Sequence, residues 1–302
     1  MDIRGLGYVI IESTDLARWE RFGCQVLGLM KSPGMPQEEM LHLKMDEYPW
    51  RFRIVPGRRD RFVAAGWEVP GAAAWQRAVA RLEETGIGVE QGSAAEAADR
   101  RVRQVARFVA PGGLCCEIYH GMQLDYQPLI SPVGVRRFVT GYHGDMGLGH
   151  IAAATPELAA SHAFFTEVMG FGQVDFMHFH FHPDPEDPGQ GLHFLHCNNP
   201  RHHSLALFED RQPHPGGLVH LMVEVEDLDT LGHMMDRVRE HGVKVITGLG
   251  RHSNDRMVSI YVESPAGFAL EYGFGGVQVD WDHYTPTESA VPSVWGHQWG
   301  QG

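Results

Sequence analysis

Along this chain, apolar residues recur at every second position in some segments, as in a β-strand, and at every third or fourth position in others, as in a helix. Residues 149–155 alternate like a β-strand, in which successive side chains point to opposite faces. Thr155 and Pro156 then predict the start of a helix, with Thr155 as the N-cap and Pro156 at the first helical position. The apolar stripe expected on this helix consists of Leu158, Phe165, Val168 and Met169.

A second strand and helix follow the same plan. Residues 217–225 form a predicted strand, Asp227 caps the helix that follows, and Gly242 ends it. Each half of the chain contains two such units, in which a strand leads to a helix and then to further short strands, so four units are expected. The apolar face predicted for this second helix consists of Leu228, Leu231, Met235 and Val238.

The two halves of the chain resemble each other. Three segments of the first half match three segments of the second half in the same order and without gaps. Collinear matches of this kind favour an internal duplication over chance similarity. The matches pair residues 16–29 with 158–171, residues 81–89 with 237–245, and residues 111–117 with 265–271.

The duplication predicts a division into domains. A length of 302 residues suits two domains of about 150 residues each. We expect an N-terminal domain over 1–130, a linker over 131–145, a C-terminal domain over 146–275 that carries the chemistry, and a tail rich in turn residues over 276–302.

Composition and charge exclude several classes of partner. The formal net charge is -13 and no basic stripe is present, so nucleic acid is not expected as a partner. No apolar run approaches the roughly 20 residues of a membrane span, and no signal peptide is recognisable, so we expect no membrane association and a cytoplasmic location. The four cysteines show no C-x-x-C spacing and are expected to be reduced and buried.

The 19 histidines are unusual, and imidazole is the commonest metal ligand. His150 and His220 lie on predicted strands, and Glu271 interrupts an otherwise apolar strand, where an unpaired carboxylate would be costly. Two histidines and one carboxylate can form a facial triad, which leaves positions on a metal open for substrate and oxygen. Taken singly, a histidine in such a chain is more often a satisfied core or surface residue than a metal ligand, and periodicity alone does not overturn this alternative.

Longer motifs carry a family resemblance. Residues 250–271, GRHSNDRMVSIYVESPAGFALE, resemble the signature of the type I extradiol ring-cleavage dioxygenases of the vicinal oxygen chelate superfamily. With residues 147–150, 196–207 and 218–225, the chain most resembles the 2,3-dihydroxybiphenyl 1,2-dioxygenase branch, over nearly its whole length. Ser264 departs from the signature, which usually has threonine or an acidic or amide residue there.

The resemblance implies a fold, a metal and an assembly. The implied fold is α+β, with four βαβββ modules paired into two half-open barrel domains. His150, His220 and Glu271 would bind Fe(II), and Mn(II) suits the same ligands. The family also implies a homo-oligomer.

The same comparison implies that the first half holds a degenerate copy of the site. Tyr8 lies at the position of His150, and Ala64 at that of His220. Glu117 matches Glu271 and is expected to be a hydrogen-bonded remnant. The N-terminal domain would then be structural.

Three further side chains receive catalytic roles from the resemblance. His203 would be the acid-base residue, because histidine can accept and return a proton near neutral pH. Tyr261 would hydrogen-bond a substrate hydroxyl, and His252 would orient that network. An error of one position would exchange His202 for His203, and a packed aromatic residue is the alternative for Tyr261.

The substrate site is expected to be apolar. Phe194, Ala152 and Pro292 lie near the motifs and would line a pocket, while Asn254 and Asp255 would shape the adjoining turn. The resemblance implies a substituted catechol and O2 as substrates, and 2,3-dihydroxybiphenyl or a related bicyclic or steroid catechol fits an apolar pocket best.

Two other functions use the same fold. One is a glyoxalase-like lyase or isomerase, which would need neither His203 nor Tyr261, and the other is a binding protein of the antibiotic-sequestering type. The run His178, His180 and His182 is expected on an exposed strand or loop, although it could bind metal or line the mouth of the cavity. The favoured function is extradiol ring cleavage in the degradation of aromatic compounds.

Overall fold

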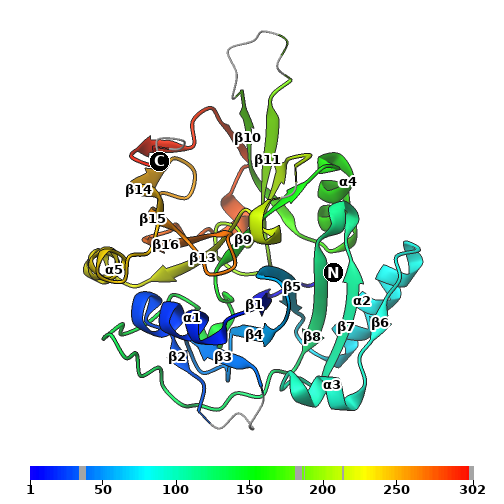
Figure 1. Cartoon of the computed structure of the whole chain (residues 1–302). Helices are drawn as coiled ribbons and strands as arrows, with labels where there is room; N and C mark the ends of the chain where they lie inside the picture. The colour runs from blue at the N-terminus through cyan, green and yellow to red at the C-terminus, as the bar shows by residue number, and fades with distance from the viewer. Residues whose placement is uncertain (34–38, 181–185, 187, 213, 299–302) are drawn as a thin grey trace.

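The protein consists of two mixed β-sheets, one from each half of the chain, with the helices on their outer sides (Figure 1). The computed structural model describes residues 1–33, 39–180, 186, 188–212 and 214–298. In Figure 1 the sheet of the second half lies above that of the first, and the hairpin of β10 (Gly172–Phe179) and β11 (Gln190–His196) projects at the top.

Eight strands form the first sheet, in the order β2-β3-β4-β1-β5-β8-β7-β6. Its elements along the chain are β1 (Gly5–Ser13), α1 (Leu16–Arg21) continued by a π-helical turn (Phe22–Leu27), β2 (Met30–Lys31), β3 (Leu41–Lys44), β4 (Phe52–Pro56), β5 (Arg61–Glu68), α2 (Ala72–Glu84), β6 (Glu90–Gln91), α3 (Ala94–Asp99), β7 (Gln104–Val109) and β8 (Cys115–His120).

Ten strands form the second sheet, in the order β17-β10-β11-β12-β9-β13-β16-β15-β14-β18. Besides β10 and β11, its elements are β9 (His150–Thr155), α4 (Leu158–Ala163) continued by a π-helical turn (Phe164–Val168), β12 (Leu205–Glu209), β13 (His220–Val225), α5 (Leu228–Glu240), β14 (Val245–His252), β15 (Val258–Glu263), β16 (Ala269–Phe274), β17 (Thr287–Ser289) and β18 (Ser293–Trp295).

The strand pairing reveals four repeated modules. In each module the first strand pairs in parallel with the last, as β1 does with β4, β5 with β8, β9 with β12 and β13 with β16. Two modules then join through an antiparallel seam between their first strands, which is β1 with β5 in the first sheet and β9 with β13 in the second. The predicted α+β fold of four βαβββ modules in two sheets is confirmed.

The two helices predicted in the second half are present, but one begins later than expected. Thr155 is the last residue of β9, and α4 begins at Leu158 with Glu157 as its N-cap. The predicted cap at Thr155 is therefore wrong. The hydroxyl of Thr155 instead shares a hydrogen bond of 2.8 Å with Ser161 and accepts one from the Glu157 amide, so it supports the turn that precedes the helix.

Helix α5 follows the prediction more closely. The Asp227 carboxylate accepts a hydrogen bond of 2.7 Å from the amide of Thr230, as an N-cap does. The buried face consists of Leu231, Met234 and Val238, whereas Leu228 is 52% exposed. Leu228 is the first residue of the helix, and its assignment to the buried face is wrong.

The tail joins the second sheet at both of its edges. Strand β17 pairs with β10, and β18 pairs with β14, so the segment expected only as a turn-rich tail completes the sheet. The cysteines also differ from expectation at one position, since Cys115 is exposed whereas Cys24, Cys116 and Cys197 are buried, and none is in a disulfide.

Aromatic side chains fill the inside of the first sheet. The ring of Tyr8 lies 4.6 Å from that of Trp50 and 4.8 Å from that of Tyr119, measured between centroids, and all three residues are fully buried. The inner face of the second sheet instead carries small residues such as Ala152 and Ala206 beside its cavity. The first sheet therefore encloses a packed core, whereas the second has room for a ligand.

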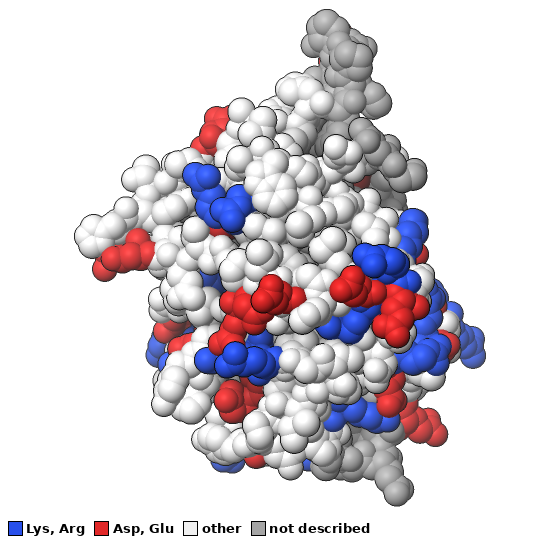
Figure 2. Space-filling view, turned by 90° about the vertical axis from the view of Figure 1, so that its left-hand side faces the viewer, with Lys and Arg blue, Asp and Glu red and all other residues white. Residues whose placement is uncertain are grey.

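The surface carries charges of both signs. On the face shown in Figure 2, basic and acidic side chains intermingle over the lower part, and the upper part carries few of either. Salt bridges such as Arg61 with Glu12 and Lys31 with Glu20 join opposite charges at the protein surface. No helix in the described part of the chain has the length and apolar composition to span a membrane.

Candidate metal centre and substrate cavity

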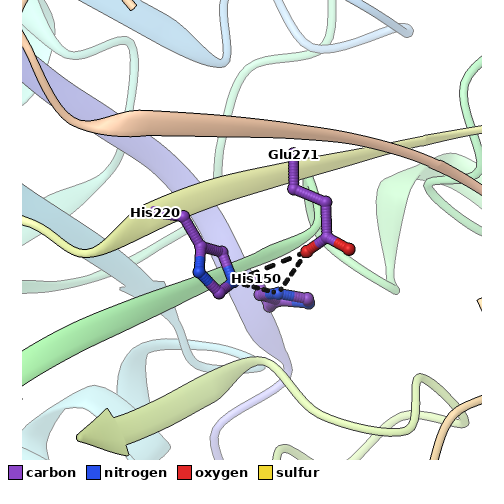
Figure 3. A group of neighbouring side chains, drawn as sticks. All are labelled: His150, His220 and Glu271. Carbon is purple, nitrogen blue, oxygen red and sulfur yellow. Dashed lines mark hydrogen bonds and ion pairs between the residues drawn. The ribbon is translucent and has the colours of Figure 1, made fainter. Parts of the chain in front are cut away.

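The strand register brings His150, His220 and Glu271 together on the inner face of the second sheet. Met222 of β13 pairs with His150 of β9 on one side and with Glu271 of β16 on the other. His220 lies two residues before Met222, and side chains two residues apart share a face of a strand. Figure 3 shows the three side chains pointing toward one another from neighbouring strands.

The distances among these side chains suit metal ligands. Nε2 of His150 lies 2.9 Å from Nε2 of His220 and 3.3 Å from Oε2 of Glu271, and the His220 and Glu271 atoms are 3.5 Å apart. Neighbouring ligands on one ion are separated by roughly 3 Å when each metal bond is about 2.1 Å long. All three atoms therefore fit one face of a single metal ion.

The protonation states also suit a metal. Burial lowers the pKa of His220 to about 3, so its ring is neutral. Burial alone would raise the pKa of the Glu271 carboxyl, but hydrogen bonds with His150 and His252 hold it well below its usual range. Neutral imidazole and ionised carboxylate are the forms that bind metals, and a carboxylate only 1% exposed needs such compensation.

A cavity of ≈ 360 Å³ opens directly over these three residues. Its walls are predominantly apolar and come from both ends of the second sheet, so the sheet curves around the cavity. All five residues expected at the substrate site, which are Ala152, Phe194, Asn254, Asp255 and Pro292, line it. The sequence analysis did not identify seven further lining residues: Met177, Phe179, Leu192, Ala206, Phe208, His214 and Val219.

His203, and not its neighbour His202, faces this cavity. The His203 ring lies 4.0 Å from the His150 ring and packs edge-on against Phe194. His202 points away from the cavity, with Nε2 3.2 Å from the Asp175 carboxylate. Burial and the neighbouring His150 lower the pKa of His203 well below its usual value, so it is a neutral ring at the cavity wall.

Tyr261 and His252 form a hydrogen-bonded pair on the opposite wall. Nε2 of His252 lies 2.8 Å from the Tyr261 hydroxyl and 3.2 Å from Oε1 of Glu271, and its Nδ1 faces the carbonyl of Pro292 at 3.1 Å. Burial alone would lower the pKa of His252, but Glu271 raises it to about 9. The predicted network therefore exists, and it reaches the carboxylate of the metal centre.

The tail supplies a residue to which the sequence analysis gave no role. The ring of His297 packs 4.3 Å from that of His252, and its Nδ1 lies 2.9 Å from the hydroxyl of Ser293. Gly250 allows this approach, because a Cβ there would lie 2.4 Å from the His297 ring. His297 therefore supports the His252 ring by packing against it. The pairing of β18 with β14 brings the tail, and with it His297, to this position.

The equivalent place in the first half holds a closed hydrogen-bond network. Tyr8 pairs with Gly66, which pairs with Glu117, as His150, Met222 and Glu271 do in the second half. The Tyr8 hydroxyl donates to Glu117 at 2.6 Å, and Arg100 donates two hydrogen bonds of 2.7 Å to the same carboxylate. Ala64 lies two residues before Gly66 and offers no ligand atom.

Replacing Glu117 with alanine should therefore affect stability and not metal binding. Arg100 and the Tyr8 hydroxyl would lose their shared acceptor in a buried position, which we expect to cost about 3 kcal/mol of unfolding free energy. Urea unfolding would measure the loss, and metal analysis should give the same content as the wild type. A fall in bound metal with unchanged stability would contradict the assignment of Glu117 as a structural residue.

The predicted histidine run is exposed where it is described. His178 and His180 are both exposed near the end of β10, with their rings 5.0 Å apart, and neither lines the cavity. His182 lies outside the described residues.

Comparisons with known proteins match both halves of the chain. Residues 147–272 match the model of the Glyoxalase/Bleomycin resistance protein/Dioxygenase superfamily, and residues 6–57 match that of Dihydroxybiphenyl dioxygenase BphC D1. An iron-dependent extradiol dioxygenase of Rhodococcus jostii is 39% identical, over 100% of this chain and 99% of that protein. This chain belongs to the extradiol dioxygenase family.

Other extradiol dioxygenases are also similar to this chain over nearly its whole length. The biphenyl-2,3-diol 1,2-dioxygenase of Paraburkholderia xenovorans is 36% identical, over 99% of this chain and 96% of that protein. The crystal structure of BphC, a halotolerant catechol dioxygenase, superimposes with a TM-score of 0.87 at 33% identity, covering 99% of this chain and 95% of the other. The resemblance found in the sequence is confirmed, including the branch to which it pointed.

Proposed function

We propose that this extradiol dioxygenase cleaves the ring of a substituted catechol with O2, using Fe(II) held by His150, His220 and Glu271. The observation that carries the proposal is the position of this triad at the floor of an apolar cavity. His203 and Tyr261 stand on the walls of the same cavity. A metal binder without chemistry would need neither of these two side chains at the metal.

The cavity supports a substrate with an apolar substituent. Beyond the metal centre, Met177, Leu192, Phe194 and Phe208 make the walls apolar. A volume of ≈ 360 Å³ lies at the lower end of the range for small-molecule pockets. We infer that 2,3-dihydroxybiphenyl or a related bicyclic or steroid-like catechol is the substrate, and relatives named as biphenyl-2,3-diol 1,2-dioxygenases support this.

The side chains divide the chemistry between them. A bound metal ion would attract the two catechol oxygens and favour their ionised form. His203 would take a hydroxyl proton and return it later to a product oxygen. Tyr261 would donate a hydrogen bond to a catechol oxygen, oriented by His252 on its other side. The apolar walls would exclude water, which strengthens each of these interactions.

Iron is the proposed metal, and the triad suits manganese almost as well. The relative from Rhodococcus jostii named as iron-dependent supports iron. Metal analysis of the protein as purified, without added salts, would distinguish the two ions. A stoichiometric content of manganese with no iron would replace Fe(II) in the proposal.

Anaerobic reconstitution tests the function. After addition of Fe(II), 2,3-dihydroxybiphenyl and then air, we expect one O2 consumed for each catechol and a yellow ring-opened product. 4-Hydroxybiphenyl, which lacks adjacent hydroxyls, is the matched control and should consume no O2. Absence of O2 uptake with biphenyl, steroid and simple catechols would refute the dioxygenase function and favour a lyase or a binding protein.

We also infer a cytoplasmic homo-oligomer. The four cysteines are free, which suits a reducing compartment. Val291, Val294 and Trp295 of the tail are exposed apolar residues that a second subunit could cover. Light scattering coupled to gel filtration should give a mass that is a multiple of 33.7 kDa.

A further inference from the structure

Three buried polar side chains, those of His203, His202 and Asp175, form a row that begins at the cavity wall and leads away from the cavity. Nδ1 of His203 lies 3.1 Å from Nδ1 of His202, and Nε2 of His202 lies 3.2 Å from Oδ2 of Asp175. The three residues are each at most 4% exposed. None of the metal ligands belongs to this row, and the proposed function leaves His202 and Asp175 without a role.

Asp175 is held so that one carboxylate oxygen faces His202. Its other oxygen, Oδ1, accepts hydrogen bonds from the hydroxyls of Tyr284 at 2.9 Å and Thr287 at 2.6 Å. Burial alone would raise the pKa of Asp175, but the bonds from His202, Thr287 and Tyr284 lower it. Asp175 is therefore an ionised acceptor.

The contact between Asp175 and His202 is looser than an ideal hydrogen bond. Within the described part of the chain, neither Oδ2 of Asp175 nor Nε2 of His202 forms a hydrogen bond of ordinary geometry, with each other or with another group. Both atoms are buried, and a buried ionised oxygen without a donor would be costly. The 3.2 Å approach of the two atoms is the polar contact that places a ring nitrogen beside this oxygen.

The row determines which nitrogen of His203 carries a proton. A neutral imidazole has one N–H donor and one acceptor nitrogen. Because a carboxylate only accepts, a neutral His202 beside Asp175 would carry its proton on Nε2 and leave Nδ1 as the acceptor. Nδ1 of His203 must then donate across the 3.1 Å contact, which leaves Nε2 of His203 unprotonated for the cavity.

We propose that Asp175 and His202 are positioning residues that hold His203 in the tautomer whose free Nε2 faces the cavity. The inference rests on the proposed function, in which His203 accepts a proton from the catechol. The proton would go from a catechol hydroxyl to Nε2, and the imidazolium so formed would share its Nδ1 proton with His202 beside Asp175. A third group that orients a catalytic base in this way is known from hydrolases.

Asp175→Asn is the decisive substitution, because the side-chain amide can donate to Nε2 of His202. His202 would then carry its proton on Nδ1, and His203 would take the opposite tautomer, with Nε2 protonated. We expect kcat to fall by about 100-fold or more, with the KM for the catechol changed by less than about threefold. Asp280→Asn is the matched control, because Asp280 forms an exposed pair with His283 at 2.8 Å, and it should retain wild-type kcat.

A conservative series at His202 separates orientation from simple packing. His202→Gln keeps both an acceptor and a donor, whereas His202→Leu keeps only similar bulk. We expect the leucine variant to be at least about tenfold slower than the glutamine variant, with equal metal content in both. Equal rates in these two variants would show that His202 acts only by packing.

A spectroscopic readout does not depend on turnover. In full-length protein labelled with 15N in its histidine rings and loaded with Zn(II), the His203 signal should show protonated Nδ1 in the wild type and protonated Nε2 in Asp175→Asn. The His203→Gln spectrum would assign the signal. Protonated Nε2 in the wild type would overturn the proposal.

The outcomes also separate this inference from the proposed function. If the wild type cleaves no catechol, the function fails, while the NMR result still decides the tautomer. If the wild type is active and Asp175→Asn is equally active, only the present inference fails. A cation held by His202, His203 and Asp255, whose ligand atoms lie within 4.8 Å of one another, would appear as a second equivalent of Zn(II) and would also overturn it.

Discussion

His150→Ala is expected to lose its metal and with it all ring-cleavage activity. Structural zinc sites with four protein ligands bind their metal with about 10–16 kcal/mol, which is roughly 2.5–4 kcal/mol per ligand, so loss of His150 should lower metal affinity by about 10²-fold. His150 is also the contact at 2.9 Å to His220 and at 3.3 Å to Glu271, so the two remaining ligands lose the group that aligns them. Metal analysis after gel filtration would show far less than one equivalent.

The control for this variant is a histidine outside the cavity. His283 is exposed, and His283→Ala should keep one equivalent of metal and wild-type kcat. The N-terminal half should remain folded in His150→Ala, because the aromatic core around Trp50 contains no metal ligand. Full metal content in His150→Ala would contradict the assignment of the triad.

His203→Ala is expected to give the opposite combination, with metal and catechol still bound and turnover slow. The His203 ring packs against the His150 ring, with 4.0 Å between the ring centroids. Loss of a general acid-base residue lowers kcat by about 10²–10⁴-fold. Single-turnover kinetics after mixing the Fe(II)-loaded catechol complex with O2 would measure the chemical step directly.

Two further measurements define the role of His203. Anaerobic titration with 2,3-dihydroxybiphenyl should give a dissociation constant within about threefold of the wild type, because the ring is not expected to bind the metal. His202→Gln offers a comparison one position away and should lose less activity than His203→Ala. Equal metal loss in His150→Ala and His203→Ala would refute the separation of their roles.

Much of the fold was predictable because duplication and periodicity are properties of the sequence. Residues 16–29 and 158–171 match each other and both form a helix continued by a π-helical turn. The start of α4 was not predictable, because Thr155 satisfies a local capping pattern yet pairs with Glu209 of β12. Pairing between strands far apart in the chain overrides such local preferences.

The residues of the site were predictable only where a motif reports them. The motif of residues 250–271 contains His252, Tyr261 and Glu271, and the structure brings all three within hydrogen-bond distance of one another or of a shared partner. Asp175 and His297 lie outside every motif that was given a role. Their positions depend on the register of β10 and β18, which periodicity cannot fix when hydrophobic alternation is weak.

The seam between paired modules has a consequence for how the protein is assembled. In the first half, the hydroxyl of Tyr8 in one module donates a hydrogen bond to Glu117 in the next module. In the second half, His150 belongs to one module and both His220 and Glu271 to the other, so a bound ion would fasten the same seam. Metal would thus select the state in which these two modules have docked, and its uptake would report a late folding event. The duplicated halves would then differ in what joins the side chains across the seam: a hydrogen bond between Tyr8 and Glu117 in one, and a bound ion in the other.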